Sequence, residues 1–250
     1  MKAKSRVFGL TLWLIALFGM QEALMAPGLF GEANAQAVDL PRVERGTDGS
    51  FADLMYERRS VRRYASGELD MEQISQILFA AQGVTRQKRF RTVPSAGALY
   101  PLEVYLVAGK VQGLEAGVYK YEPHGHRLLP VSLGDKRREL AQESYSQMWI
   151  AQAQAVLVVC AVYERVTGKY GSRGERYVHI EAGCAAQNVS LAGYSLGLGS
   201  TVVGAFSDRG VQKVIGAQNK EEPLIVMPVG RLKETERISQ NLDATKSSRE

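Results

Sequence analysis

Four neighbouring side chains could together bind a phosphate group: Arg58, Arg59, Ser60 and Arg62. An arginine guanidinium stays charged at any working pH and can donate to two phosphate oxygens at once, and a serine hydroxyl adds a further donor. The same residues could instead be the solvated basic end of a helix, which needs no ligand. The residues alone leave both interpretations open.

A second segment could accommodate a flat ring because it consists of small residues: Pro94, Ser95, Ala96 and Gly97. Their backbone could approach such a ring closely, with no bulky side chain in the plane of the ring. Pro-Ser-Ala-Gly is also ordinary turn chemistry. On these residues alone, a turn without a ligand is the favoured interpretation.

Other motifs argue against several kinds of chemistry. The glycines between residues 193 and 199 end a predicted helix instead of opening one after a strand, so they are not a dinucleotide fingerprint. Two cysteines and three histidines without ligand spacing predict no metal site. His124, His126 and His179 lack evident partners in the sequence, and we interpret them as surface or core residues.

The apolar pattern predicts the elements that would position these segments. Helices are predicted over residues 51–58, 70–81, 135–149 and 174–196, and a capping box of Asp70 and Gln73 opens the second. Strands are predicted over residues 103–108, 117–121, 127–131, 155–162, 201–204 and 224–229. Residues 155–162 read as a central strand buried on both faces. The alternation predicts an α+β sandwich, a central sheet of four or five strands packed by helices.

The N-terminus has the pattern of a targeting segment. Lys2, Lys4 and Arg6 precede an apolar run, and Ala35 and Ala37 fit small-residue cleavage sites. We therefore expect residues 1–37 to be a signal peptide and the protein to be exported, most simply to the periplasm. An uncleaved segment that anchors the protein to a membrane is the alternative.

The rest of the chain has the length of one α/β domain. We expect a linker or arm over residues 38–50, one domain over residues 51–235 and a polar tail over residues 236–250. The formal charge is +5 at pH 7. Because the cations are dispersed and no basic stripe is interleaved with aromatic residues, we expect no nucleic-acid partner.

Several motifs in order resemble one known family. Arg58–Tyr64 (RRSVRRY) resembles the opening motif of the nitroreductase family of flavin oxidoreductases. Residues 94–105 (PSAGALYPLEVY) resemble its branch of SagB-type dehydrogenases, which includes azoline oxidases. Further matches to that branch are Lys169-Tyr170-Gly171, Arg173-Gly174, Arg176-Tyr177, Glu181-Ala182-Gly183, Ala186-Gln187-Asn188 and Pro228-Val229-Gly230-Arg231. The resemblance extends from about residue 56 to residue 231.

The resemblance implies an FMN-binding homodimer with each site at the subunit interface. It places Arg58, Ser60 and Arg62 at the FMN phosphate and ribityl chain, and residues 94–97 of the partner subunit along the ring. It places Val203, Gly204 and Ala205 near the reactive N5 edge, and Gly230 and Arg231 at the cofactor as well, with Arg231 on the phosphate. Lys169 and Tyr170 occupy the position of a catalytic Lys-Tyr pair. A solvated lysine in a strand-to-helix loop is the plainer interpretation of that pair.

The resemblance also implies an activity. We expect a flavin oxidoreductase that works by ping-pong hydride transfer through flavin N5, to or from a small planar substrate. A flavin-binding protein without turnover, which acts in sensing or assembly, is the alternative. The chain lacks the large extra N-terminal domain of many azoline oxidases, which argues against partnership with a peptide cyclase.

Overall fold

The computed structural model describes residues 37–42, 51–85 and 89–234. The strands within these ranges form one antiparallel sheet. Seven strands lie in the order β1-β4-β3-β2-β5-β7-β6. Their bounds are β1 Val38–Asp39, β2 Leu102–Ala108, β3 Gly117–Glu122, β4 Arg127–Leu133, β5 Ala155–Ala161, β6 Leu198–Ser200 and β7 Glu222–Arg231. The expected sheet of four or five strands is therefore too small, because the short edge strands β1 and β6 extend it.

Strand β5 lies at the centre of the molecule, between β2 and β7, and is buried along its whole length. Alternate residues pack into different cores: Leu157 and Val159 belong to one apolar cluster, and Val156 and Val158 to the other. The continuous apolar run therefore forms a strand covered on both faces, as predicted.

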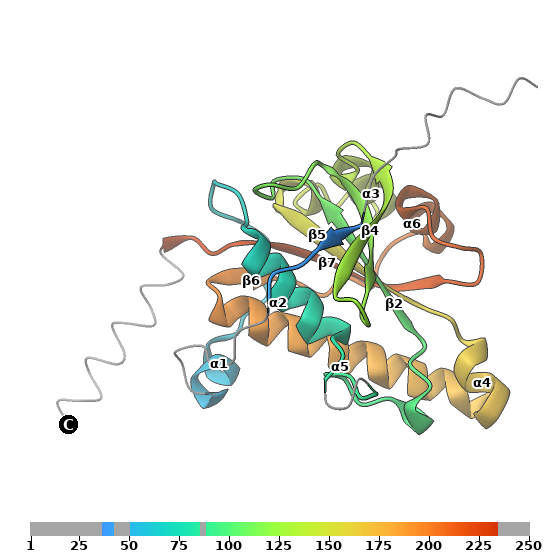
Figure 1. Cartoon of the computed structure of the whole chain (residues 1–250). Coiled ribbons are helices and arrows are strands. Elements are labelled where there is room, and N and C mark those ends of the chain that lie inside the picture. The colour runs from blue at the N-terminus through green and yellow to red at the C-terminus, as the bar shows by residue number, and fades with distance from the viewer. Residues whose placement is uncertain (1–36, 43–50, 86–88, 235–250) are drawn as a thin grey trace, which may run out of the picture. The chain divides into compact units, whose positions relative to one another are not determined.

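Helices cover both faces of the sheet (Figure 1). One face packs against α2 (Met71–Gln82) and α5 (Arg173–Ser195), and the other packs against α3 (Arg137–Glu143) and α6 (Asp208–Ile215). Two short helices, α1 (Phe51–Glu57) and α4 (Glu164–Tyr170), also contact α5. The 3-10 turns are η2 (Ala96–Ala98) and η3 (Ile150–Gln152).

The predicted capping box at the start of α2 is confirmed. The Gln73 amide donates to Asp70 Oδ1 at 2.7 Å, and the Asp70 amide donates to Gln73 Oε1 at 3.2 Å. Helix α5 also agrees with its predicted range, and Gly197, just beyond it, has a φ of 72°. A left-handed glycine at this position is a common helix ending.

Two predicted elements are wrong in extent. The helix expected over residues 135–149 ends at Glu143, because Tyr145 and Ser146 have positive φ values of 52° and 58° that no helix accommodates. The strand expected over residues 201–204 lies earlier, as β6, and of that stretch only Val203 forms an isolated bridge, with Val226.

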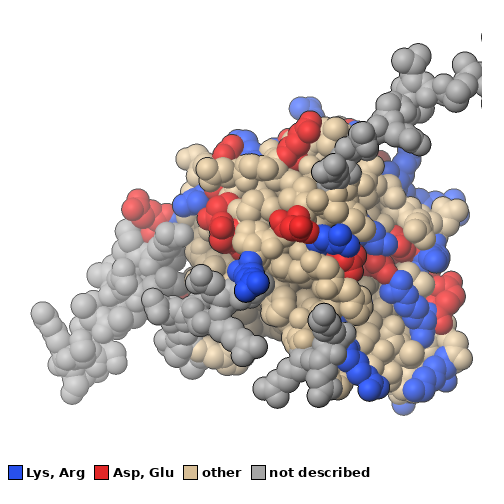
Figure 2. Space-filling model, viewed as in Figure 1, with Lys and Arg blue, Asp and Glu red and all other residues tan. Residues whose placement is uncertain are grey.

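The predicted signal peptide lies outside the described residues except for residue 37, and the predicted tail lies outside them entirely. Within the expected linker, Val38 and Asp39 form β1, which pairs with β4. No helix among the described residues is long and apolar enough to cross a membrane. Figure 2 shows basic and acidic side chains interspersed over the face in view.

Candidate active site

The predicted phosphate cluster lies on a backbone segment that pairs with edge strand β6. Ser60 forms a parallel bridge with Ser200, and the Val61 amide donates to the Ser200 carbonyl at 2.9 Å. The Thr201 hydroxyl donates to the Val61 carbonyl at 2.7 Å. A Cβ on Gly199 would lie 2.5 Å from the Val61 side chain, so glycine permits this approach. The sheet thus fixes the backbone that carries the arginines.

The arginines of this cluster have different surroundings. Arg59 Nη1 donates to three carbonyls at the end of α1, at 2.7, 3.1 and 3.3 Å, so it turns back over that helix. The Arg62 guanidinium lies 5.5 Å from the centroid of the Trp149 ring. Arg58 is half-buried and Arg62 is exposed, and neither forms an ion pair with a described residue. Both can therefore receive an anion.

Arg231 reaches the same edge of the sheet from the other end of the chain. Its carbonyl accepts from the Ala65 amide at 2.9 Å, and its Nη1 donates to the Glu68 carbonyl at 3.3 Å. The preceding Gly230 is buried, and a Cβ there would meet Gln154 Oε1 at 2.3 Å. Gly230, predicted to contact a cofactor, therefore has a packing role in this edge.

The segment that contains Val203, Gly204 and Ala205 runs on from β6. Val203 is buried, whereas Gly204 and Ala205 are exposed, and apart from its chain neighbours no described residue has an atom within 4 Å of the position of a Cβ on Gly204. Gln147 Nε2 donates to the Ala205 carbonyl at 3.1 Å. Gln147 and the nearby Trp149 line this region, and nothing in their sequence pattern distinguishes them from other polar or aromatic residues.

The small-residue segment at residues 94–97 meets the predicted Lys-Tyr pair. Gly97 has a φ of 62°, and a Cβ on it would lie 2.8 Å from the Tyr170 hydroxyl and 3.1 Å from Lys169 Nζ. Lys169 is exposed, and Tyr170 packs edge-on against Tyr177 at 5.2 Å between ring centroids. The pair ends helix α4, so the alternative of a strand-to-helix loop is wrong, although the lysine is solvated.

These two groups contact α5 at different places along its length. Val61, in the first group, packs against Tyr194 in the last turn of the helix. Tyr170, in the second, packs against Tyr177 in its early turns. Within the 23 residues of α5, Tyr177 and Tyr194 are about 25 Å apart along the helix axis. One subunit therefore presents its cations and its small-residue segment at two separate places.

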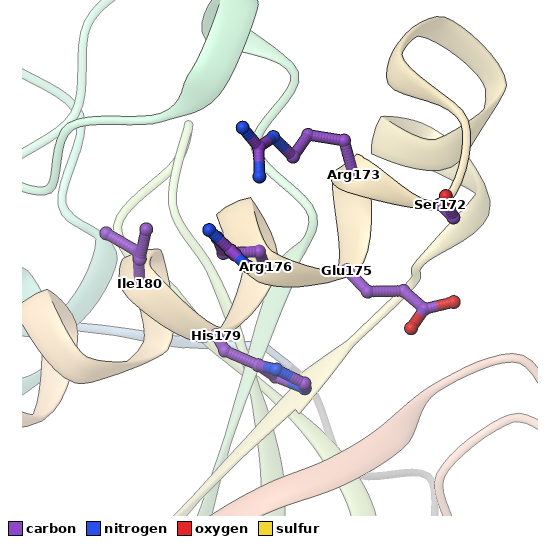
Figure 3. A pocket seen from close by; sticks show the side chains of 6 residues that line it. All are labelled: Ser172, Arg173, Glu175, Arg176, His179 and Ile180. Carbon is purple, nitrogen blue, oxygen red and sulfur yellow. The ribbon is translucent and has the colours of Figure 1, made fainter.

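An open pocket of about 660 Å³ lies on the first turns of α5. It is lined by Ser172, Arg173, Glu175, Arg176, His179 and Ile180. Figure 3 shows the guanidinium groups of Arg173 and Arg176 on one side of the helix, with Glu175 and His179 directed elsewhere. His179 Nε2 lies 2.6 Å from the Tyr163 hydroxyl, so the histidine has a partner that the sequence did not reveal.

The chain belongs to the nitroreductase family, since the family model matches residues 55–231. Members of this family are generally flavin-dependent oxidoreductases that act on small molecules. The family assignment therefore identifies the protein as an oxidoreductase with this fold.

Particular relatives agree with the family. The chain is 48% identical over 194 residues to MJ1384 of Methanocaldococcus jannaschii, assigned as a nitroreductase, with coverage of 78% of this chain and 96% of the relative. A nitroreductase-assigned structure from Ralstonia eutropha has a TM-score of 0.70 at 27% identity, with coverage of 80% and 91%. The Microcin B17-processing protein McbC of Escherichia coli is 32% identical over 148 residues, and the match covers 56% of this chain and 54% of McbC.

Proposed function

We propose that this protein is an FMN-dependent oxidoreductase that transfers hydride between two small molecules in a ping-pong cycle. The observation that carries the proposal is the convergence of Arg58 and Arg62 with Arg231 at one edge of the sheet, from opposite ends of the chain. Three arginines on backbone segments that meet at one edge suit a phosphate-bearing cofactor.

The residues at this edge fit FMN in chemistry and in shape. Arg58, Ser60, Arg62 and Arg231 would hold the phosphate and the ribityl chain. The exposed, small residues Gly204 and Ala205 leave space beside them for a flat ring. Bound FMN would supply hydride acceptance and donation at N5. The chain itself needs only to fix the ring, admit one flat molecule at a time and limit the access of water.

We further propose that the site is completed by a second copy of the chain. Ser95 lies beside Glu181 of α5, whereas Val61 in the cation-bearing segment packs against Tyr194, about 20 Å further along the helix axis, so one subunit presents its small-residue segment and its cations at different places. Apolar side chains on and near α5 support a partner: Phe51 is 69% exposed, Tyr56 76% and Ile180 57%. A homodimer would bring the small-residue segment of one subunit to the cations of the other.

Lys169 and Tyr170 are proposed as the catalytic pair. The Lys169 ammonium would stabilise negative charge at the ring, and the Tyr170 hydroxyl would give or accept a proton on the substrate. The open pocket of about 660 Å³ on the first turns of α5 is the proposed entrance for the substrate. This pair, together with the similarity to McbC, supports a place in the SagB-type dehydrogenase branch.

We also propose that residues 1–37 direct export to the periplasm. Cell fractionation followed by N-terminal sequencing tests this. A mature chain that begins after Ala35 or Ala37 in the periplasmic fraction is the expected result, and an intact N-terminus in the membrane fraction would indicate an anchor instead.

The absorption spectrum of the purified full chain, with the released chromophore identified by mass, tests the cofactor. Bound FMN is expected, and a colourless protein that also rejects added FMN would overturn the proposal. Anaerobic reduction followed by addition of a quinone or a nitroaromatic then tests turnover. Flavin that no reductant or acceptor can turn over would favour the inert flavin-binding alternative.

A further inference from the structure

Glu181 is a carboxyl group of α5 that is buried beside the segment containing Ser95. Its exposed fraction is 2%, and the Ser95 side chain lies beside it. Glu181 Oε1 and the nearby Gln82 Nε2 are buried without a hydrogen-bond partner among the described residues. A buried carboxyl with an unsatisfied oxygen is costly to keep ionised, so its presence needs a physical explanation.

The Ser95 hydroxyl links Glu181 to the turn formed by residues 95–100. Its oxygen accepts a hydrogen bond from the Tyr100 amide at 2.9 Å, and its side chain also lies beside Glu181. Ala98 and Tyr100 in this turn have positive φ values of 55° and 47°. Such a conformation persists only where the surrounding structure enforces it. The carboxyl is therefore one of the contacts that can hold the turn.

Arg91 is a charged neighbour of Glu181 from the stretch that precedes Pro94. Its Nη1 donates to Gln82 Oε1 at 2.7 Å, and its guanidinium lies 4.7 Å from the centroid of the Tyr100 ring. Other charged groups that act on this guanidinium are Glu103 and Arg165. Arg91 is thus shared among several partners and does not neutralise Glu181 alone.

We propose that Glu181 is a positioning residue for the segment at residues 94–97. The neutral carboxyl of Glu181 supports the closed conformation of this segment, in which it lies against α5, and the ionised carboxylate opposes that conformation. On ionisation the proton passes to solvent and leaves a charge in a site shielded from water. Movement of the segment away from α5 would let water solvate that charge. The extension to flavin binding rests on the proposed function.

The direction follows from linkage between the proton and the conformation. Burial raises the pKa of Glu181 from 4.5 to about 7, although Ser95, Arg91 and Gln82 each act to lower that pKa. The closed form therefore binds the proton more tightly than an open, hydrated form. The contribution of Glu181 to the closed conformation is complete below about pH 4.5 and is lost as the pH rises through about 7. Between about pH 6 and about pH 8, the opening constant should rise up to about tenfold.

Hydrogen exchange of the Ala98 amide measures this opening, because that amide donates to the Ser95 backbone carbonyl at 3.1 Å, a bond that Ser95→Ala retains. The full chain is measured without flavin between about pH 5 and about pH 9, and each rate is divided by the intrinsic rate. The wild-type opening constant should show an inflection near pH 7, where Glu181 titrates. Glu181→Gln should abolish the inflection, because its amide cannot ionise.

Two further variants separate this role from a purely structural one. Ser95→Ala should move the inflection to higher pH, because the hydroxyl lowers the pKa of Glu181. Glu72→Gln removes an exposed carboxylate from α2 and should behave as the wild type. An identical pH dependence in wild type and Glu181→Gln would overturn the proposal, as would an inflection that Ser95→Ala leaves in place.

Titration with FMN over the same pH range tests the extension to the cofactor. The affinity of the wild type, divided by that of Glu181→Gln, should fall as the pH rises through about 7. The ratio cancels the titration of the FMN phosphate, and a constant ratio would reject the extension. If the wild type binds no FMN, the proposed function fails, whereas the exchange data still decide the role of Glu181.

Discussion

The Tyr170 hydroxyl lies 2.8 Å from the position that a Cβ on Gly97 would occupy. The small-residue segment and the end of α4 are therefore in contact within one subunit, although more than seventy residues separate them in the sequence. Glycine is required at position 97 for two reasons: its φ is 62°, and there is no space for a Cβ beside Tyr170. This contact joins the segment expected at the flavin ring to the residues expected to act on the substrate.

Gly97→Ala should destabilise the protein by about 2 kcal/mol or more, because the strained φ and the close contact add together. Gly113→Ala is the matched control, since Gly113 has a φ of 75° with no atom within 4 Å of its Cβ position. Denaturant unfolding of both variants measures the difference. Equal losses of stability would show that the contact with Tyr170 costs nothing.

Arg58→Ala combined with Arg62→Ala should weaken FMN binding at least about a hundredfold, since each charge-assisted contact contributes about 1.5–3 kcal/mol. Stability should change little, because neither side chain forms an ion pair with a described residue. Arg63→Ala, an exposed cation of the same segment, is the control. Unchanged flavin affinity in the double variant would show that the phosphate binds elsewhere.

Mixing two inactive variants tests whether subunits share a site. In the proposed dimer, each site combines the cations of one subunit with Lys169 of the other. A mixed dimer of one Arg58→Ala, Arg62→Ala subunit and one Lys169→Met subunit would therefore contain one site with all the substitutions and one intact site. After exchange at equal amounts, activity should recover to about a quarter of the wild type, since half of the dimers are mixed. No recovery, despite mixed dimers detected by mass, would place each complete site within one subunit.

Tyr170→Phe should reduce turnover roughly a hundredfold, the usual effect of losing a proton-transferring group. Flavin affinity should stay the same, because phenylalanine keeps the edge-on contact with the Tyr177 ring. Tyr177→Phe is the control and should leave turnover near that of the wild type. Single-turnover oxidation of the reduced flavin distinguishes the two, and equal rates would remove Tyr170 from the chemistry.

Acid should loosen the N-terminal arm, residues 37–42. The Ser75 hydroxyl donates to the Pro41 carbonyl at 2.5 Å, so it accepts from His126 Nε2 at 2.8 Å. The Tyr121 hydroxyl then donates to His126 Nδ1, also at 2.8 Å. This arrangement needs a neutral ring, and burial accordingly lowers the pKa of His126.

The contribution of His126 is therefore present above pH 6.5, its ordinary pKa, and is lost as the pH falls through its lowered value. Exchange of the Leu40 amide, which donates to the His126 carbonyl at 3.2 Å, should report this loss. His126→Gln should flatten the pH dependence. Protection of Leu40 that persists in acid would contradict the assignment.

Elements with a strong pattern of their own were predictable from the sequence. The run at β5, the small-residue helix α5 and the capping box at Asp70 each carry a local signal, and each is confirmed. Strands β1 and β6 have two and three residues, too few for any periodicity to show. They exist because a neighbouring strand offers backbone partners, and the predicted sheet was therefore too small.

The residue types at the candidate site could also be predicted from the sequence, but the contacts that surround each residue could not. Arg59 belongs to the predicted cluster, yet it turns back onto α1. Trp149 lies beneath Arg62, although the sequence predicted it inside a continuous helix. Glu181 reads as one polar residue in a small-residue helix, and only the folded chain shows that Ser95 lies against it. Such pairings are created by tertiary contacts.

Strand β1 has a consequence for the solution behaviour of the protein. Val38 and Asp39 occupy the backbone groups of β4 at Leu128 and Arg127, which would otherwise form the outer margin of the sheet. A free margin is a template for adding a strand from another molecule. Proteolytic loss of residues 37–42 should therefore first cause self-association by strand addition, while the edge at β6, on the opposite side of the sheet and proposed to bind the cofactor, stays intact.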